Sequence, residues 1–94
     1  YMIRSFKSKG TEKIFNRITS RKLPIEIQQR AMRKLWMLDA AQNLLDLKVP
    51  SSNNLEKLKG SKEGIYSIRI NSQWRICFQW LQNNAYGVEI IDYH

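Results

Sequence analysis

The last residues of the chain combine three side chains that can transfer protons or stabilise charge. Asp92, Tyr93 and His94 follow directly on an apolar run, and His94 is the only histidine of the 94 residues. Imidazole and carboxylate groups have pKa values suited to proton transfer near neutral pH. A terminal histidine taken alone is usually a frayed end, so its role depends on the groups beside it.

Further charged residues could complete such a site, namely Glu56, Lys59, Arg69 and Arg75. Lysine and arginine stabilise developing negative charge, and the planar guanidinium suits phosphate. The sequence has no Gly-rich phosphate loop, no Ser–His–Asp order and no cluster with metal-ligand spacing, so we expect neither a metal nor a cofactor. This inventory fits cleavage of RNA by its own 2′-hydroxyl, and Tyr66, Trp80 or Tyr93 could stack on a splayed base.

Three strand-like runs, at 65–70, 74–81 and 85–91, are expected to position these groups, with polar turns at 71–73 and 82–84. Side chains alternate between the two faces of a strand, so three-residue turns keep the even positions on one face. These even positions are apolar and form the expected core face: Ile68, Ile70, Trp74, Ile76, Phe78, Val88 and Ile90.

The opposite face carries the charged residues, together with Cys77, Ile91 and Tyr93. In this register Arg69 lies directly opposite Arg75, which costs a few tenths to about 1 kcal/mol. An anion between the guanidiniums would offset that cost. The structural alternative is that both arginines point into water or pair with Glu89 or Asp92. Beyond Ile91 the last residues need not be tied into the sheet.

The first half of the chain is predicted to be helical support. Residues 25 to about 39 carry the buried stripe Ile27, Ala31, Leu35 and Leu38, and Pro24 suits the first turn. Weaker expected elements are a strand at 2–6, a helix at about 12–18 with Thr11 as its N-cap, and a short helix at 40–47. Together they predict one α+β domain over residues 1–94, with N-terminal helices packed on one face of a small, mainly antiparallel sheet.

The net charge of +8 comes from the N-terminal third of the chain. Such a surplus favours an acidic partner, most often nucleic acid, although a highly charged solvated surface is the plain alternative. The candidate RNA contacts there are Arg17, Arg21, Lys22, Arg30 and Arg33. The same residues could equally face an acidic patch on a protein partner.

Several classes are disfavoured by the sequence. No apolar run approaches the ~20 residues of a membrane span, and no apolar segment of a signal peptide is visible, so we expect a cytoplasmic protein. Met2 is expected to be the natural start, with Tyr1 an added residue. Cys77 has no second cysteine to pair with and is expected to be a buried structural thiol.

Four segments of the sequence resemble HigB-type killer toxins of the RelE/ParE-like superfamily: MIRSF at 2–6, LEKLKG at 55–60, YSIRINSQWRICF at 66–78 and VEIIDYH at 88–94. The resemblance covers essentially the whole chain and implies a RelE-like fold. It implies metal-independent cleavage of messenger RNA on the translating ribosome, giving a 2′,3′-cyclic phosphate and a 5′-hydroxyl. It also implies a HigA-like helix-turn-helix antitoxin, through which alone the toxin would reach operator DNA.

Carried over position by position, the resemblance assigns catalytic roles to Lys59, Arg75, Asp92, Tyr93 and His94. Glu56 departs from the family, because some members have a histidine at this position. Either Glu56 takes over the proton transfer or His94 is the only efficient acid–base group, in which case cleavage is slower.

The sequence leaves two other functions open. A ParE-like inhibitor that binds DNA gyrase without catalysis would not need Arg75, Asp92 and His94 together. An inactive basic RNA-binding module fits the charge, but it does not need a functional Asp-Tyr-His end.

Overall fold

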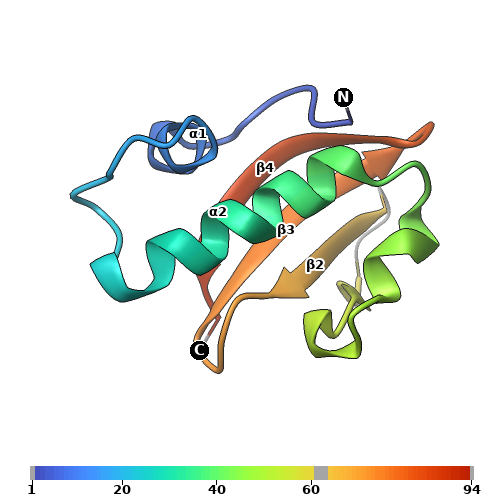
Figure 1. Ribbon diagram of the computed structural model, residues 1–94. Coiled ribbons are helices and arrows are strands. Elements are labelled where there is room, and N and C mark those ends of the chain that lie inside the picture. The colour runs from blue at the N-terminus through green and yellow to red at the C-terminus, as the bar shows by residue number, and fades with distance from the viewer. Residues whose placement is uncertain (1, 61–63, 94) are drawn as a thin grey trace.

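A layer of two helices covers one face of a four-stranded antiparallel sheet in the computed structural model, which describes residues 2–60 and 64–93 (Figure 1). The elements are α1 (Lys9–Phe15), α2 (Ile25–Ala40), β1 (Glu56–Lys57), β2 (Ile65–Arg69), β3 (Trp74–Leu81) and β4 (Asn84–Asp92), and the strands follow one another in the order β1-β2-β3-β4. The predicted α+β architecture is confirmed. Besides the three predicted C-terminal strands, the sheet contains β1, which was not predicted and is only two residues long.

Helix α2 packs its apolar stripe on the sheet. Ile27, Ala31, Leu35 and Leu38 are all at most 3% exposed, as their spacing predicted. They join the apolar residues of β2, β3 and β4 in one core. Pro24 is the N-cap of α2 rather than its first helical residue. Burial of an isoleucine or leucine side chain stabilises the fold by about 1.5–3 kcal/mol.

Helix α1 begins earlier than predicted, and the assignment of Thr11 as its N-cap is wrong. Ser8 caps the helix, and its Oγ accepts a 3.2 Å hydrogen bond from the backbone N–H of Thr11. Thr11 is fully buried, and its Oγ1 accepts from the backbone N–H of Ile90 at 2.9 Å. The threonine therefore ties the helix to β4, where the core needs a satisfied polar group.

The predicted N-terminal strand is not a regular strand. The segment runs parallel to β4 and forms two isolated bridges, Ile3 with Ala85 and Phe6 with Val88. Between these bridges β4 has an irregular position at Gly87, whose N–H donates to Ser5 Oγ at 2.8 Å. The two bridges therefore do not join into a continuous ladder between this segment and β4.

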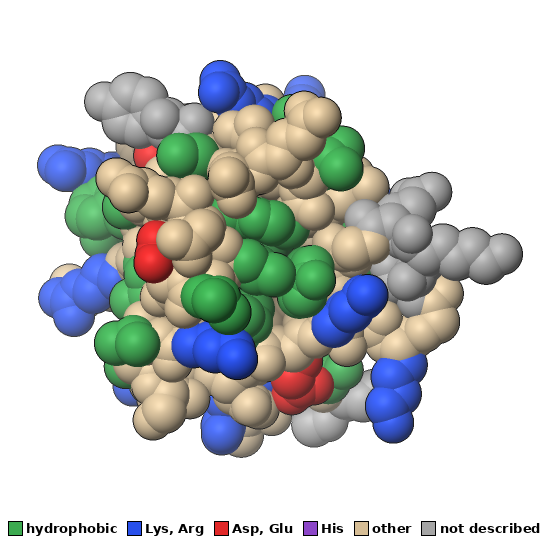
Figure 2. All heavy atoms as spheres, turned by 90° about the vertical axis from the view of Figure 1, so that its right-hand side faces the viewer, with side chains coloured by type: hydrophobic (Ala, Val, Ile, Leu, Met, Phe, Trp, Pro, Cys, Tyr) green, Lys and Arg blue, Asp and Glu red, His purple; other side chains and the backbone are tan. Residues whose placement is uncertain are grey.

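The predicted helix at 40–47 is wrong. Helix α2 ends at Ala40, and two 3-10 turns follow at Leu44–Lys48 and Ser51–Asn53. Asp46 Oδ2 accepts from the backbone N–H groups of Gln42 and Asn43 at 2.9 and 3.2 Å, which starts a new turn instead of continuing the helix. Figure 2 views the molecule from this side, where hydrophobic side chains gather near the centre of the face with Lys and Arg around them.

The β2–β3 hairpin has the expected register. Ile68 pairs with Ile76 and Arg69 with Arg75. The β3–β4 turn is shorter than predicted, because Leu81 pairs with Asn84 and only Gln82 and Asn83 lie between them, with φ of 51° and 62°. Positive φ at both central residues is what a type I′ turn requires.

A bulge in β4 compensates for the shorter turn. The register shifts by one between Cys77 and Gln79, next to Gly87 with φ of +58°. Glycine in the left-handed region is typical of such a bulge. Beyond it the alternation is the predicted one, so Val88 and Ile90 are buried in the core. Within the described part of the chain, no helix has the length and apolar character that a membrane span requires.

Candidate active site

Arg75 is a buried cation near the start of β3, on the sheet face away from the helices. Only 5% of the residue is exposed. Its Nε donates to Ser67 Oγ at 2.8 Å, and its Nη2 donates to the backbone oxygens of Asn54 at 2.6 Å and Ser67 at 3.2 Å. A buried guanidinium is tolerated only with such partners. The contacts fix its orientation and leave Nη1 on the open side.

Glu56 meets Arg75 on that open side. In the short strand β1 it pairs with Ser67 of β2, so its carboxylate lies over the same face of the sheet. Glu56 Oε1 is 3.6 Å from Arg75 Nη1 and accepts from Asn54 Nδ2 at 3.0 Å. Its side chain is 42% exposed, so the carboxylate also faces solvent.

The structural alternative to an anion site was that Arg75 points into water or pairs with Glu89 or Asp92. In the structure Arg75 forms its ion pair with Glu56. Glu89 pairs with Lys7 at 3.7 Å. Arg69 is exposed although it lies opposite Arg75 in the ladder. The facing arginines therefore relieve their repulsion by taking different surroundings, and an anion between them stays a prediction.

The end of β4 is tied to the sheet, contrary to expectation. Asp92 pairs with Trp74, and the backbone N–H of Tyr93 donates to Gln73 O at 2.6 Å. Gln73 Nε2 also donates to Asp92 Oδ2 at 3.0 Å. The Tyr93 ring lies 5.4 Å from the Arg75 guanidinium carbon, within the range of a cation–π interaction. Tyr93 thus comes to lie beside Arg75, while Asp92, opposite Trp74, is held at the end of β4 by Gln73.

Lys59 and His94 complete the set of predicted catalytic residues. Lys59 is exposed just after β1 and precedes Gly60, whose φ is +78°. His94 lies outside the described residues. The described part of the chain holds no group of three or more His, Cys, Asp or Glu residues that could bind a metal ion.

Tyr66 does not join this constellation. Its ring stacks on the buried Phe78 with 6.4 Å between centroids, on the core side of the sheet. Trp80 packs edge-on against the same phenylalanine at 6.2 Å. Of the three aromatic residues proposed to stack on a base, only Tyr93 is on the Arg75 face.

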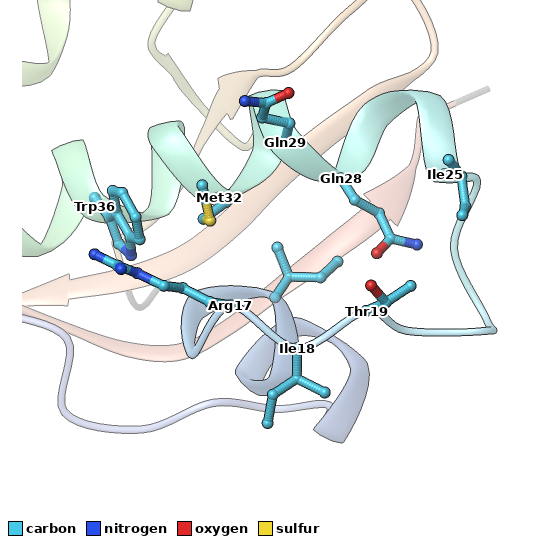
Figure 3. Close-up of a pocket in the computed structure, with 9 residues that line it drawn as sticks. Arg17, Ile18, Thr19, Ile25, Gln28, Gln29, Met32 and Trp36 are labelled. Atoms are coloured by element: carbon cyan, nitrogen blue, oxygen red, sulfur yellow. The ribbon is translucent and has the colours of Figure 1, made fainter.

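The predicted RNA-contacting cations lie in the helical half of the chain. Arg17 stacks over the Trp36 ring at 4.8 Å, beside a groove of about 580 Å³ between α1 and α2. Figure 3 shows Met32, Gln28 and Ile25 directed toward this groove from α2. Arg21, Lys22 and Arg33 are exposed, and Arg30 lines a separate cavity with Arg69.

Three residues of the site were missed in the sequence: Ser67, Asn54 and Gln73. Ser67 had a detectable signal, since it is a small polar residue on the Arg75 face of β2, between Ile65 and Arg69. Gln73 belongs to a predicted turn, where Asn71 Oδ1 accepts from the N–H groups of Gln73 and Trp74 at 2.8 Å each. Asn54 binds Arg75 through its backbone carbonyl, and that contact carries no sequence signal.

Comparison with known proteins identifies the family of the chain. The family described as RelE-like toxin of type II toxin–antitoxin system HigB matches residues 4–94. Toxin HigB-1 of Vibrio cholerae is 40% identical over 85 residues, which cover 89% of this chain and 90% of that protein. Endoribonuclease HigB of Proteus vulgaris is 34% identical over 93 residues, covering 99% of this chain and 100% of that protein. The chain therefore belongs to the HigB-like family of RelE-like toxins from type II toxin–antitoxin systems.

Proposed function

We propose that this toxin is a ribosome-dependent endoribonuclease that cleaves messenger RNA during translation without a catalytic metal, and so inhibits growth. The observation that carries the proposal is the convergence of Glu56 and Tyr93 on the buried Arg75, with Asp92 next to Tyr93 at the end of β4. The similarity over the full length to a relative named Endoribonuclease HigB supports it.

In the proposed reaction the 2′-oxygen of the RNA attacks the adjacent phosphorus, and the bond from phosphorus to the 5′-oxygen breaks. A base, Glu56 or His94, takes the 2′-hydroxyl proton, and an acid gives a proton to the leaving 5′-oxygen. Arg75 and Lys59 stabilise the charge of the phosphorane. Asp92 and Tyr93 orient the terminal histidine and the substrate. The products are a 2′,3′-cyclic phosphate and a 5′-hydroxyl.

Arg75 supports this role because its geometry is set before substrate arrives. Three hydrogen bonds to Ser67 and Asn54 fix the guanidinium plane, so little reorganisation is needed when negative charge develops. Nη1 is the donor that remains on the Glu56 side. A phosphate oxygen entering there would replace or share the carboxylate contact.

Toxins of this class act with a cognate antitoxin. We infer a HigA-like helix-turn-helix antitoxin that neutralises this chain and that alone brings it to operator DNA. Action on translating ribosomes implies a cytoplasmic location.

The test is to map messenger RNA ends on ribosomes after expression of the full chain and of a chain lacking His94. We expect new ends with cyclic phosphate and 5′-hydroxyl chemistry from the full chain, and none from the folded truncated chain. Gyrase-dependent DNA breaks with intact messenger RNA would overturn the proposal in favour of a ParE-like activity. New ends carrying 5′-phosphates would contradict the proposed chemistry.

A further inference from the structure

A second group of cations lines a cavity at the end of the sheet where β2 and β3 are connected. The cavity has a volume of about 590 Å³ and lies between α2, the second 3-10 turn and the β2–β3 connection. Arg30 and Lys34 come from α2 and Arg69 from the end of β2. The rest of the lining is Ser52, Ile70, Asn71 and Ser72.

Two of the three cations are anchored by neutral partners. Arg30 Nη1 donates to the backbone oxygen of Ile70 at 3.3 Å. Lys34 Nζ donates to Asn53 Oδ1, and Asn53 is itself fully buried, with its amide donating to Leu47 O at 3.1 Å. Each anchor uses one donor, whereas a guanidinium has five and an ammonium three. The anchors therefore hold the charges in place without neutralising them.

No carboxylate balances these charges within the described residues. In 2–60 and 64–93, neither Asp nor Glu forms an ion pair with Arg30, Lys34 or Arg69. Burial, and then the charge of Arg30, lower the pKa of Lys34 below its usual value. Gathering like charges in a partly buried cavity is unfavourable, and a bound anion would offset that cost.

The cavity and the candidate active site lie on either side of one turn. Ile70, Asn71 and Ser72 line the cavity, and the next residue, Gln73, binds Asp92 and Tyr93. In Figure 1 the C-terminal end of the chain lies beside this β2–β3 connection. Strands β2 and β4 are two strand spacings apart, about 10 Å. A single RNA strand crossing the turn would pass both sites.

We propose that the cavity of Arg30, Lys34 and Arg69 binds a backbone phosphate of the RNA substrate that flanks the cleaved one. Arginine forks and serine hydroxyls supply the donors that phosphate oxygens accept. Because phosphate contacts carry no base information, the site positions the strand and does not select its sequence. This inference rests on the proposed function, but its test is separate.

The test compares RNA binding by the wild type and by the double variant Arg30→Gln, Arg69→Gln. The matched control is Lys9→Gln, Lys13→Gln, which removes two exposed charges from α1, outside the cavity. The probe is an eight-nucleotide single-stranded RNA with 2′-O-methyl riboses, which cannot be cleaved, and Kd is measured by fluorescence anisotropy across a salt series. Glutamine at position 30 keeps a donor for Ile70 O.

We expect the cavity variant to raise Kd at least about fourfold at 0.15 M salt and to reduce the salt slope by at least about 0.7, the value for one lost phosphate contact on a single strand. The control should change both quantities less than half as much. Equal changes in the two variants would overturn the inference. Weaker antitoxin binding with RNA binding at the control level would also overturn it, in favour of protein carboxylates as the ligand.

Two further measurements separate the alternatives. Thermal unfolding checks that the variants fold, and Lys34→Gln repeats the test if the double variant does not. Wild-type protein that leaves messenger RNA intact on ribosomes would contradict the proposed function, while the RNA affinities would still decide the cavity. Messenger RNA cleavage at equal rates by the wild type, cavity variant and control would retain the function and count against the cavity.

Discussion

Arginines in two regions of this toxin have opposite surroundings. Arg75 is 5% exposed, and its donors meet Ser67, Asn54 and Glu56. Arg69, directly opposite it in the ladder, is exposed and lines a cavity with two other cations. Adjacent strands thus hold one cation that belongs to the folded interior and one that is open to a ligand.

The difference separates two effects that a change of charge usually combines. Removing a buried, hydrogen-bonded cation leaves its partners unsatisfied, so stability and activity should fall together. Removing a cation from a cavity without carboxylates relieves repulsion, so stability should hold while binding weakens. The following predictions test this distinction, beginning with the largest expected effect.

Replacing Arg75 with alanine should have the largest effect. We expect cleavage of messenger RNA on ribosomes to fall by about 100-fold or more, because the main preorganised charge at the site is lost. The free energy of unfolding should fall by about 2–4 kcal/mol, since the buried Ser67 and the Asn54 carbonyl lose their donor. Denaturant unfolding and end mapping measure the two effects on the same protein.

The control for that change is Arg69→Ala, which removes the same charge from the opposite residue of the ladder. It should leave the free energy of unfolding within about 0.5 kcal/mol of the wild type. If Arg69→Ala destabilises the protein as much as Arg75→Ala, the two arginines contribute equally to stability, and the contrast between a buried and an exposed cation is wrong.

Changing Glu56 to histidine should raise the rate. The carboxylate 3.6 Å from Arg75 Nη1 brings negative charge to the place where a phosphate should bind, and it is a weaker base than imidazole. A gain of about tenfold in ribosomal cleavage is expected, less than the roughly 10²–10⁴-fold that a well-placed general acid or base contributes in full. Glu56→Gln separates the two causes, because it removes the charge without adding a base. No gain with histidine would show that Glu56 does not limit the reaction.

Ser67→Ala should have a smaller effect through Arg75. Ser67 does not touch the substrate in the proposed arrangement, and its Oγ positions the guanidinium by accepting from Nε at 2.8 Å. We expect a loss of about 1–2 kcal/mol in the free energy of unfolding and a several-fold decrease in kcat with little change in KM. Ser67→Thr keeps the hydroxyl and should restore most of kcat. A change confined to KM would contradict a positioning role.

The sequence predicted the parts of this arrangement that depend on periodicity. The stripe on α2 and the pairing of Arg69 with Arg75 both follow from regular spacing, and both are confirmed. The β3–β4 turn was wrong by one residue, yet Val88 and Ile90 were correctly placed, because the bulge at Gly87 restores the register. A turn that is one residue shorter and a bulge that adds one residue have opposite effects on the strand register. The alternation pattern alone therefore reveals neither of them.

The burial of Arg75 could not be predicted in the same way. It depends on a carbonyl 21 residues away, at Asn54, where the backbone takes a left-handed conformation with φ of 45°. The cavity likewise joins Arg30 and Lys34 to Arg69 across 35 residues or more of sequence, and no local pattern links them. Contacts of backbone atoms, or between cations far apart in the chain, leave no periodic pattern in the sequence from which they could be predicted.

The last prediction concerns stability alone and rests on Cys77, whose thiol reports how far water is excluded from the Arg75 face. The thiol lies opposite Ser67 in the ladder and is 6% exposed, and burial, followed by the charge of Glu89, raises its pKa from the usual 9.0 to about 11. Between these two values the unfolded chain loses the thiol proton more readily than the folded one. The free energy of unfolding should therefore fall as pH rises from about 9 to about 11. In Cys77→Ala the absolute stability will differ, but the fall over this pH range should be shallower than in the wild type. Parallel slopes in denaturant unfolding at several pH values would mean that water reaches the thiol, and that the Arg75 face is as open as the cavity of Arg69.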